Sequence, residues 1–411
     1  MSQWMTATFL GTSSGGGPTE SRNCSSLILD VVGDGSLWMI DGAEGTLRQF
    51  FLQTPKNGGK TLKVSQVSKI FVTHMHPDHV MGLPTLLRNI LGFPHAEDIS
   101  PRGTPPRVNL YGPAGLRTFL RTTLSLTRIQ TADRYAVHEL VTPTDPRTPC
   151  DNAALHDHEE PGRDVLCDED GYWRNFAEGR SFRGSVNVCA GPLVHRDPCI
   201  GFIIHEPASL PAPRKLVILG DTSSATGLTP LVYSTPGRLS LLVHEATDAH
   251  MPEDIDPRFA ARGPLAVIAA KAKERGHSTP PEAGACAGKW CARKLVLNHI
   301  GTRFPAPSPG SNSGKRVAII REIERQASEA WRATLCEVPV ESGAEAVSMA
   351  MAADEHECKA VAAYDFLTVQ IPIQSAADNN DTNHQGGGTR RQPSRSSPPK
   401  RRRGYYSGGT R

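Results

Sequence analysis

Three histidines and one aspartate stand within six residues of one another, directly after an apolar segment that predicts a strand. They are His74, His76, Asp78 and His79, and the strand is expected over Lys69–Thr73. Imidazole nitrogens and carboxylate oxygens at this density suit zinc, and manganese or iron are also compatible with them. Because adjacent side chains in a tight turn point apart, His74 and His76 can serve one metal ion while Asp78 and His79 serve another. A chance cluster of exposed histidines is the alternative, and the ordered spacing at a strand end argues against it.

Metal-ligand residue types also stand beside four other apolar segments. Asp221 follows KLVIL, His244 and Glu245 follow SLLV, and His299 follows KLVLN. His195 comes just before another apolar run. Taken singly, Asp221 could be a helix cap and His195 a residue of a surface loop. Their joint placement instead predicts a metal site gathered at one edge of a sheet from distant parts of the sequence.

The segments that must position these residues resemble short buried strands with helices between them. The expected strands are Thr6–Leu10, Ser26–Val31, Leu37–Ile40, Lys69–Thr73, Arg107–Leu110, Ile200–His205, Lys215–Leu219, Ser240–Val243 and Lys294–Leu297. Leucine and isoleucine at helical spacing predict a helix over 83–91, and a longer helix is expected around Val317–Trp331. Strands and helices in this order favour an α/β fold, an αββα sandwich whose sheets are covered by helices.

Composition narrows the class of protein. The 411 residues include 38 glycines and 33 prolines, which favours many turns and loops over a helical bundle. No apolar run approaches the ~18 residues of a membrane-spanning helix, and Met1–Leu10 shows no targeting leader. We therefore expect a soluble intracellular protein. The nine scattered cysteines form no C-x-x-C pair, which argues against a disulfide framework and a thiolate zinc site.

Two stretches differ from the rest in charge. Residues 143–180 hold nine Asp and Glu from Asp151 to Glu178 against two Arg in that span, and they predict an inserted surface excursion. Residues 375–411 are polar, rich in Gly, Ser and Pro, and expected to be disordered. This tail carries eight Lys and Arg and no acid from Arg390 onward, so the net charge of +3 leaves 3 − 8 = −5 for residues 1–389.

A series of motifs runs along the chain in a defined order. The motifs are FLGTSSGGGPTESRNCSSLIL (9–29), IDGAEGTLRQ (40–49), THMHPDHVMGLP (73–84), ILGDTS (218–223), LLVHEAT (241–247), GHST (276–279) and LVLNHIGTRF (295–304). The series resembles the successive motifs of the ribonuclease Z family, the tRNA 3′-processing branch of the metallo-β-lactamase fold. AAYDFLTVQIPI (362–373) resembles the closing strand of that family, so the hydrolase domain is expected over residues 1–374.

The resemblance implies two metal ions, most simply Zn²⁺ with Mn²⁺ as an alternative. It places the first on His74, His76 and His195 and the second on Asp78, His79 and His299, with Asp221 bridging them. Two ions about 3.5–4 Å apart can activate a water and stabilise charge on a phosphoryl centre. The resemblance also suggests Asp78 as general base.

A leaving 3′-oxygen needs a proton, and His277 is the best candidate donor. Thr279 and Glu282 fit a capping box with Pro280 at the first helical position, so His277 is expected near a helix N-terminus. Since that helix end lowers the pKa of an imidazole, a carboxylate partner is needed, and Glu245 is the candidate.

Two arginines and two departures complete the comparison with the family pattern. Arg22 and Arg48 could contact substrate phosphates, with ordinary salt bridges as the alternative. Pro77 stands where the family usually has a small residue, and it should stiffen the turn without removing a ligand. Family members carry an RNA-gripping arm, and the best matching insertion here, 143–180, is acidic and would repel phosphates.

The sequence therefore predicts a zinc-dependent endoribonuclease that removes the 3′ trailer from precursor tRNA. The resemblance also implies a homodimer, and no membrane partner is expected. The alternatives are a phosphodiesterase of the same fold acting on small or cyclic phosphate esters, and a non-catalytic RNA-binding protein on this scaffold. The tail sequence PPKRRR resembles a nuclear-import signal, so cytoplasmic and nuclear locations both stay open.

Overall fold

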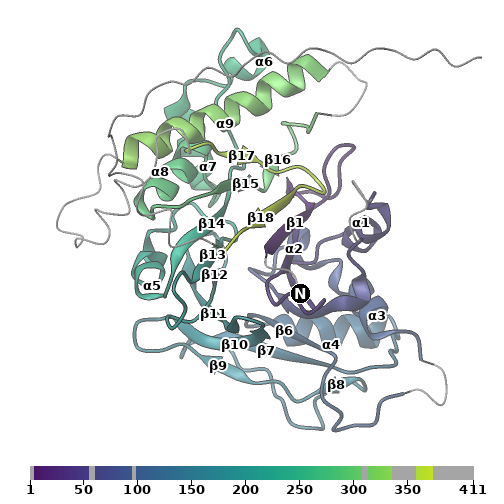
Figure 1. Cartoon of the computed structure of the whole chain (residues 1–411). Coiled ribbons are helices and arrows are strands. Elements are labelled where there is room, and N and C mark those ends of the chain that lie inside the picture. Colours follow the sequence, from purple (N-terminus) through teal and green to yellow (C-terminus); the bar gives the residue numbers. More distant parts are fainter. Residues whose placement is uncertain (1–3, 55–60, 95–98, 308–312, 336–357, 374–411) are drawn as a thin grey trace, which may run out of the picture. The chain divides into compact units, whose positions relative to one another are not determined.

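The computed structural model describes residues 4–54, 61–94, 99–307, 313–335 and 358–373 (Figure 1). The basic tail at 375–411, with the PPKRRR sequence, lies outside these residues, so its expected disorder stays a prediction.

The first sheet contains nine strands, eight from residues 5–166 and one, β18, from the closing segment. Its order is β18-β1-β3-β4-β5-β6-β7-β8, and β9 also pairs with β7. The strands are β1 (Met5–Gly11), β3 (Ser26–Asp30), β4 (Leu37–Ile40), β5 (Val67–Phe71), β6 (Val108–Pro113), β7 (Tyr135–Val141), β8 (Glu159–Glu160), β9 (Asp164–Leu166) and β18 (Thr368–Ile371). Pairing is antiparallel from β18 to β4 and parallel from β4 onward.

The second sheet contains seven strands in the order β10-β11-β12-β13-β14-β15-β17. They are β10 (Trp173–Ser181), β11 (Gly184–Leu193), β12 (Cys199–His205), β13 (Arg214–Ile218), β14 (Arg238–Glu245), β15 (Leu295–Asn298) and β17 (Val361–Ala362). Because β13, β14 and β15 run parallel, their carboxyl ends meet at one edge. A short pair, β2 (Ser13–Ser14) and β16 (Ile300–Gly301), joins the N-terminal motif to the segment after β15.

Helices cover the outer faces of the two sheets (Figure 1). The helices are α1 (Thr46–Leu52), α2 (Pro77–Val80), α3 (Leu83–Leu91), α4 (Leu116–Leu126), α5 (Thr229–Ser234), α6 (Pro257–Ala260), α7 (Leu265–Glu274), α8 (Pro280–Lys289) and α9 (Ser313–Leu335), with 3-10 turns at Val64–Gln66 and Thr226–Leu228. Buried apolar residues form one cluster between the sheets, a second between the first sheet and α3 and α4, and a third between the second sheet and α8 and α9. Three apolar layers make the four-layered αββα fold that the sequence predicts, and the expected strands and both expected helices are present.

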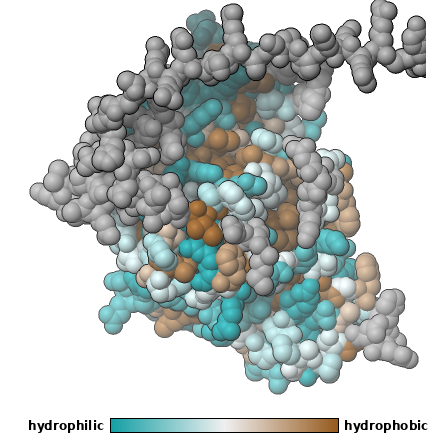
Figure 2. All heavy atoms as spheres, in the orientation of Figure 1, coloured by the Kyte–Doolittle hydropathy of each residue, from teal (hydrophilic) through white to brown (hydrophobic). Residues whose placement is uncertain are grey.

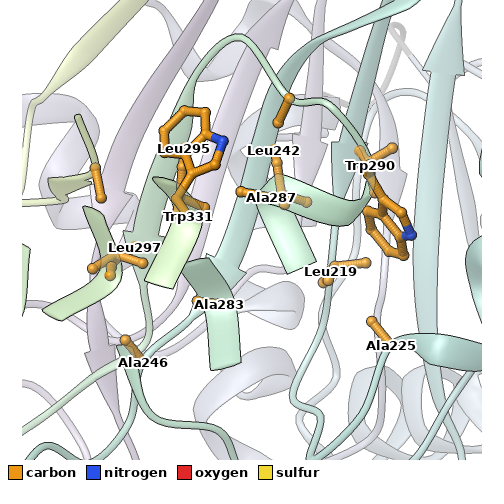
Figure 3. Packing of buried hydrophobic residues seen from close by; sticks show 14 of the residues in the cluster. Leu219, Ala225, Leu242, Ala246, Ala283, Ala287, Trp290, Leu295, Leu297 and Trp331 are labelled. Carbon is orange, nitrogen blue, oxygen red and sulfur yellow. The ribbon is translucent and has the colours of Figure 1, made fainter. Parts of the chain in front are cut away.

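The third layer depends on a close approach of α8 to α9, and Figure 3 shows Ala283, Ala287 and Trp331 among the side chains of this layer. A Cβ atom at Gly284 would lie 2.0 Å from the carbonyl oxygen of Ala327, and one at Gly288 would lie 2.8 Å from that of Trp331. Trp331 is fully buried in this layer beside Leu295. The two glycines weaken α8 as a helix, and they are required because any side chain there would separate the helices.

The acidic segment 143–180 corrects one expectation. It does not form a free surface excursion, because β8 and β9 pair with β7, β10 starts the second sheet, and Trp173 and Phe176 are buried. Five of its nine acids are ion-paired with arginines: Glu159 with Arg121, Glu160 with Arg134, Asp164 with Arg117, and Asp168 and Asp170 with Arg174. Figure 2 shows hydrophilic residues over the part of the surface where β8, β9 and β10 lie. The segment therefore presents much less free negative charge to a phosphate than its composition indicates.

Two further expectations concern cysteines and membranes. Seven cysteines within the described ranges, Cys24, Cys150, Cys167, Cys189, Cys199, Cys286 and Cys291, are free thiols, and the first, fourth and fifth of these are buried. Among the helices of these ranges, none combines the length and apolar character needed to cross a bilayer.

Candidate metal centre

The His74–His79 segment lies where β5 ends and α2 begins. Pro77 is the first residue of α2, with His76 at the N-cap position, so the fixed φ of proline starts the helix without removing a ligand residue. Asp78 and His79 lie on the turn of this helix, and the His79 ring packs beside the His74 ring with centroids 4.1 Å apart. Gly82 lies too close to the Ala43 carbonyl for any side chain, 1.9 Å from a Cβ to that oxygen, which fixes the far end of this turn.

The first ligand group, here called the first site, consists of His74, His76 and His195. His74 Nε2 lies 2.9 Å from His76 Nδ1, and His195 Nε2 lies 3.4 Å from that same atom. Together with a carboxylate oxygen of Asp221, these three nitrogens lie within 4.8 Å of one another. Four such donors around one point are the usual set for zinc.

The second ligand group, here called the second site, consists of Asp78, His79 and His299. His79 Nε2 is 3.3 Å from His299 Nε2, and His299 Nε2 is 3.3 Å from Asp78 Oδ2. His299 has a left-handed backbone with φ of 49°, which is uncommon for a residue other than glycine and typical of functional sites. The Asp78 carboxylate also accepts a hydrogen bond from the backbone N–H of Gly15 at 2.6 Å, so the N-terminal motif contributes directly to this site.

Asp221 lies between the two sites. Its Oδ2 is 3.6 Å from His74 Nε2 in the first site and 3.4 Å from His299 Nε2 in the second, while its Oδ1 is 3.5 Å from His79 Nε2. The side chain is almost fully buried, because it follows β13 at the edge where the parallel strands end. All seven predicted ligand residues are thus brought together, and the two groups fit two cations sharing one carboxylate.

Each histidine of the two sites uses its other ring nitrogen for a contact outside the centre. These contacts join His79 Nδ1 to Asp41 Oδ2 at 2.7 Å, His76 Nε2 to Asp197 Oδ2 at 2.7 Å, His195 Nδ1 to the Gly276 carbonyl at 2.7 Å, His299 Nδ1 to Thr247 Oγ1 at 2.9 Å, and His74 Nδ1 to Thr73 Oγ1 at 3.0 Å. Such partners fix the tautomer and orientation of a ligand histidine. Their presence on all five rings independently supports a metal centre.

None of these partners was predicted from the sequence. Asp41 carried a usable signal, since it follows a predicted strand just as Asp221 does. Asp197, Thr247 and Gly276 stand in loops, and no spacing links them to the histidines that they contact. Their roles depend on the fold.

His277 lies beside the centre with Glu245 as its partner. Its Nδ1 is 3.1 Å from Glu245 Oε1 and 3.8 Å from Asp221 Oδ2. Glu245 also accepts a hydrogen bond from the backbone N–H of Thr222 at 2.6 Å, so the carboxylate is held in place. The predicted capping box is present, with the backbone N–H of Thr279 donating to Glu282 Oε2 at the start of α8. His244, in contrast, is buried with its Nδ1 against the Glu245 carbonyl and belongs to neither site.

Opposing effects set the pKa values of the centre. Burial, reinforced by the charge of His79, lowers the pKa of His74 to about 2, so this ring is neutral and available as a ligand. Burial alone would raise the pKa of Asp221, but the neighbouring His299 and His79 hold it well below its usual range. Burial opposes the charge on His277, yet the hydrogen bond and charge of Glu245 outweigh it and raise the pKa of His277. These shifts favour a neutral His74, an ionised Asp221 and a protonated His277.

The two predicted phosphate contacts have different outcomes. Arg22 is only 2% exposed, and its guanidinium donates to Thr12 Oγ1 and to the carbonyls of Ala363 and Phe304. These bonds tie the N-terminal motif to the closing segment, and burial lowers the pKa of Arg22 to about 10. The predicted phosphate contact of Arg22 is therefore wrong. Arg48 is exposed on α1, and its contact stays a prediction.

Comparison with known proteins identifies the family. Residues 21–107 match the model of the metallo-beta-lactamase superfamily. The human zinc phosphodiesterase ELAC protein 1 is 30% identical over 376 residues, covering 78% of this chain and 90% of that protein. Ribonuclease Z of Streptococcus sanguinis is 29% identical over 343 residues, covering 77% of this chain and 97% of its own length.

The chain belongs to the ribonuclease Z family. The crystal structure of the short form of human tRNase Z has a TM-score of 0.56 to this chain, with 28% sequence identity, and the match covers 90% of this chain and all of that one. Membership confirms the predicted family and the metallo-β-lactamase fold, and it identifies the chain as a metal-dependent hydrolase. In this ribonuclease Z family member, the two ligand groups lie where the strand ends of both sheets meet.

Proposed function

We propose that this protein is a zinc-dependent endoribonuclease that removes the 3′ trailer from precursor tRNA and leaves a 3′-hydroxyl on the tRNA. The observation that carries the proposal is the His277–Glu245 pair beside two ligand groups that share Asp221. A two-ion centre with an adjacent proton donor suits a phosphodiester whose leaving group is an alcohol. The names of the relatives, ribonuclease Z and zinc phosphodiesterase, support the substrate class and the metal.

The chain's own residues would hold the metals in two positions. His74, His76 and His195 would hold one ion and Asp78, His79 and His299 the other, with Asp221 shared. When bound, two such cations supply an activated water and stabilise charge on the phosphoryl group. The mixture of imidazole and carboxylate donors favours zinc and remains compatible with manganese.

His277 would protonate the leaving 3′-oxygen. Its Nδ1 faces Glu245, so Nε2 is the nitrogen left for the substrate, and the side chain is 12% exposed at the edge of the centre. Glu245 orients the ring and favours its charged form. Each turnover requires that a proton return to His277 before the next cleavage.

Asp78 would orient the attacking water as a general base. Burial alone would raise its pKa, but His299 and His79 hold the pKa below the usual range. The carboxylate is therefore ionised at neutral pH and able to accept a proton, although a low pKa makes it a weak base.

Cleavage of a defined substrate tests the proposal. The purified protein is incubated with a 3′-extended tRNA transcript and with bis-p-nitrophenyl phosphate, each with and without a chelator. We expect chelator-sensitive cleavage of the transcript at one position near the end of the acceptor stem. Hydrolysis of the small diester without cleavage of the transcript would favour the alternative, a phosphodiesterase acting on small or cyclic esters. No hydrolysis of either would favour a non-catalytic RNA-binding protein.

We also propose a homodimer. Large apolar side chains on α1 and around α3 are exposed, including Phe51 (73%), Met81 (55%) and Phe93 (55%). α1 and α3 contact each other, so a second copy could cover these side chains together. Analytical ultracentrifugation should show a dimer that Phe51→Ser weakens, and a monomeric wild type would contradict this.

The location of the protein rests on the tail. We propose that PPKRRR directs import into the nucleus, with RNA tethering as the alternative. Deleting residues 385–411 should move a fluorescent fusion from nucleus to cytoplasm. An unchanged location with a weaker affinity for precursor tRNA at low salt would support tethering instead.

A further inference from the structure

A cavity of about 380 Å³ opens between α6, the segment after β16 and the first turn of α9. Four cationic side chains line it: Arg258, Arg303, Lys315 and Arg316. Asp256 is the one acid among its lining residues, and Phe259 and Ile319 contribute apolar surface. None of the metal ligands lines it, so it is separate from the metal centre.

The buried carboxylate of Asp256 is the ion-pair partner of two of these cations. Asp256 is 1% exposed, and its Oδ2 lies 2.8 Å from Lys315 Nζ. Its Oδ1 lies 3.6 Å from Arg258 Nε, and the Arg258 side chain is 82% exposed. One negative charge therefore faces two positive ones, and most of the Arg258 guanidinium remains available to solvent or to a ligand.

The carboxylate of Asp248 is likewise shared by two cationic side chains. It accepts from Arg303 Nη1 at 2.9 Å and from Arg262 Nη1 at 2.8 Å. Arg316 has an exposed partner, Glu20, at 3.2 Å. Five cations thus share three acids, which leaves a surplus of two positive charges around the cavity. The cations are Arg258, Arg262, Arg303, Lys315 and Arg316, and the acids are Glu20, Asp248 and Asp256.

Two segments of the chain run directly from the metal centre to the cavity. Thr247, which contacts the ring of His299, directly precedes Asp248. Arg303 stands four residues after His299, and a chain of four residues spans at most about 14 Å. A nucleic acid strand leaving the metal centre can therefore reach the cavity within a short length of backbone.

We propose that this cavity binds a backbone phosphate of the RNA substrate, next to the nucleotides held at the metal centre. The inference rests on the proposed function, since it assumes an RNA substrate. Guanidinium groups present several N–H donors in a fixed fork that matches phosphate oxygens. The first turn of α9, a helix of 23 residues, adds a favourable dipole at Gly314. The cavity would supply the positive grip that the segment 143–180 lacks.

The test uses a double variant, Arg258→Ala with Arg316→Ala. It leaves both buried carboxylates with a cationic partner, Lys315 for Asp256 and Arg303 for Asp248, so folding should be preserved. The control, Arg102→Ala with Arg180→Ala, removes the same charge from exposed positions outside the cavity. Thermal melting and metal content check that both proteins retain the fold and the centre.

The readout is the affinity for a 3′-extended tRNA, measured by filter binding between about 50 and about 200 mM salt. Each lost phosphate contact should lower the slope of log affinity against log salt by about one. Loss of one phosphate contact should then make the affinity defect of the cavity variant shrink by about fourfold across this range, while the control keeps the wild-type slope. Equal slopes for the wild type and the cavity variant, or the same change in the control, would overturn the proposal.

The two proposals fail differently. A wild type that binds the transcript without cleaving it, together with a cavity variant that shows the lower salt slope, refutes the proposed function and supports the cavity. A wild type that cleaves the transcript while the cavity variant binds it unchanged refutes the cavity alone.

Discussion

The two metal sites have the same kind of ligands and very different surroundings. The second site is held by Asp41, which is 4% exposed in its side chain and also accepts hydrogen bonds from the backbone N–H and the hydroxyl of Thr73. The corresponding carboxylate of the first site, Asp197, is 62% exposed. Both carboxylates lie 2.7 Å from the histidine that they orient. The two carboxylates therefore make contacts of the same length, but Asp41 is held more firmly than Asp197.

The two carboxylates are held with different rigidity because they lie in different parts of the fold. Asp41 lies at the end of β4 with a left-handed backbone, φ of 56°, and joins β4 to β5 through Thr73. Asp197 lies in the short loop between β11 and β12. A buried partner with several hydrogen bonds cannot rotate away, whereas an exposed carboxylate exchanges between the histidine and water. We therefore expect the first site to release its metal more readily than the second.

Removing the shared carboxylate should have the largest effect. Asp221→Ala takes a ligand from both sites, so hydrolysis of bis-p-nitrophenyl phosphate should fall to background, and metal content should fall from about two ions per chain toward zero. Asp78→Ala should also abolish hydrolysis but lower the content only toward one ion, because the first site keeps its ligands. Elemental analysis of metal-replete proteins gives both numbers. Two ions in Asp221→Ala would show that Asp221 does not bridge the sites.

His277→Ala should have the next largest effect, and it should act on chemistry without removing metal. We expect kcat for the tRNA transcript to fall by about 10²–10⁴, the usual contribution of a general acid. Hydrolysis of a p-nitrophenyl ester should fall much less, since p-nitrophenolate leaves without a proton. Equal losses on both substrates would contradict the role of His277 as proton donor.

The sequence predicts the strands that are buried on both faces, because their apolar runs are continuous. It does not predict β7, whose interior positions hold His138 and Glu139. Those polar side chains are tolerated because His138 lies 3.0 Å from Asn109 Oδ1 and Glu139 accepts from the backbone N–H of Arg117. Partners supplied by other elements leave no mark in the local pattern. The sequence does not predict the β10–β11 hairpin either, because exposed polar residues interrupt its apolar alternation.

The local sequence pattern also decides which residues of the candidate site can be predicted. The metal-ligand residues lie shortly after strand ends or, for Asp78 and His79, in the short helix that follows β5, and that regularity makes all seven visible in the sequence. Arg22 could not be assigned correctly from sequence, because a motif arginine that binds carbonyls and one that binds phosphates have the same spacing. Only the packing of the closing segment at Ala363 distinguishes the two.

Asp41→Asn should weaken metal binding at the second site by about 10–100-fold, the usual effect of removing a carboxylate that orients a ligand histidine. The amide keeps the shape of the side chain but replaces one acceptor oxygen with a donor. It therefore also disturbs the bonds to Thr73 and should lower thermal stability. Metal retention after dialysis against a graded chelator measures the affinity. Unchanged retention would contradict the positioning role of Asp41.

Asp197→Asn should give the smallest effect of the series, confined to the first site. The wild type should lose its ions to a chelator in two phases, and the faster phase should belong to the first site, where Asp197 is exposed. The substitution should accelerate that phase by up to about tenfold, the lower end of the range for such partners, and leave the slower phase unchanged. Thermal stability should not change, because no buried hydrogen bond is lost. Glu169→Gln, which removes an exposed charge elsewhere, should leave both phases as in the wild type. Acceleration of the slower phase by Asp197→Asn would mean that the two sites exchange metal as one unit, and the contrast drawn from their burial would not hold.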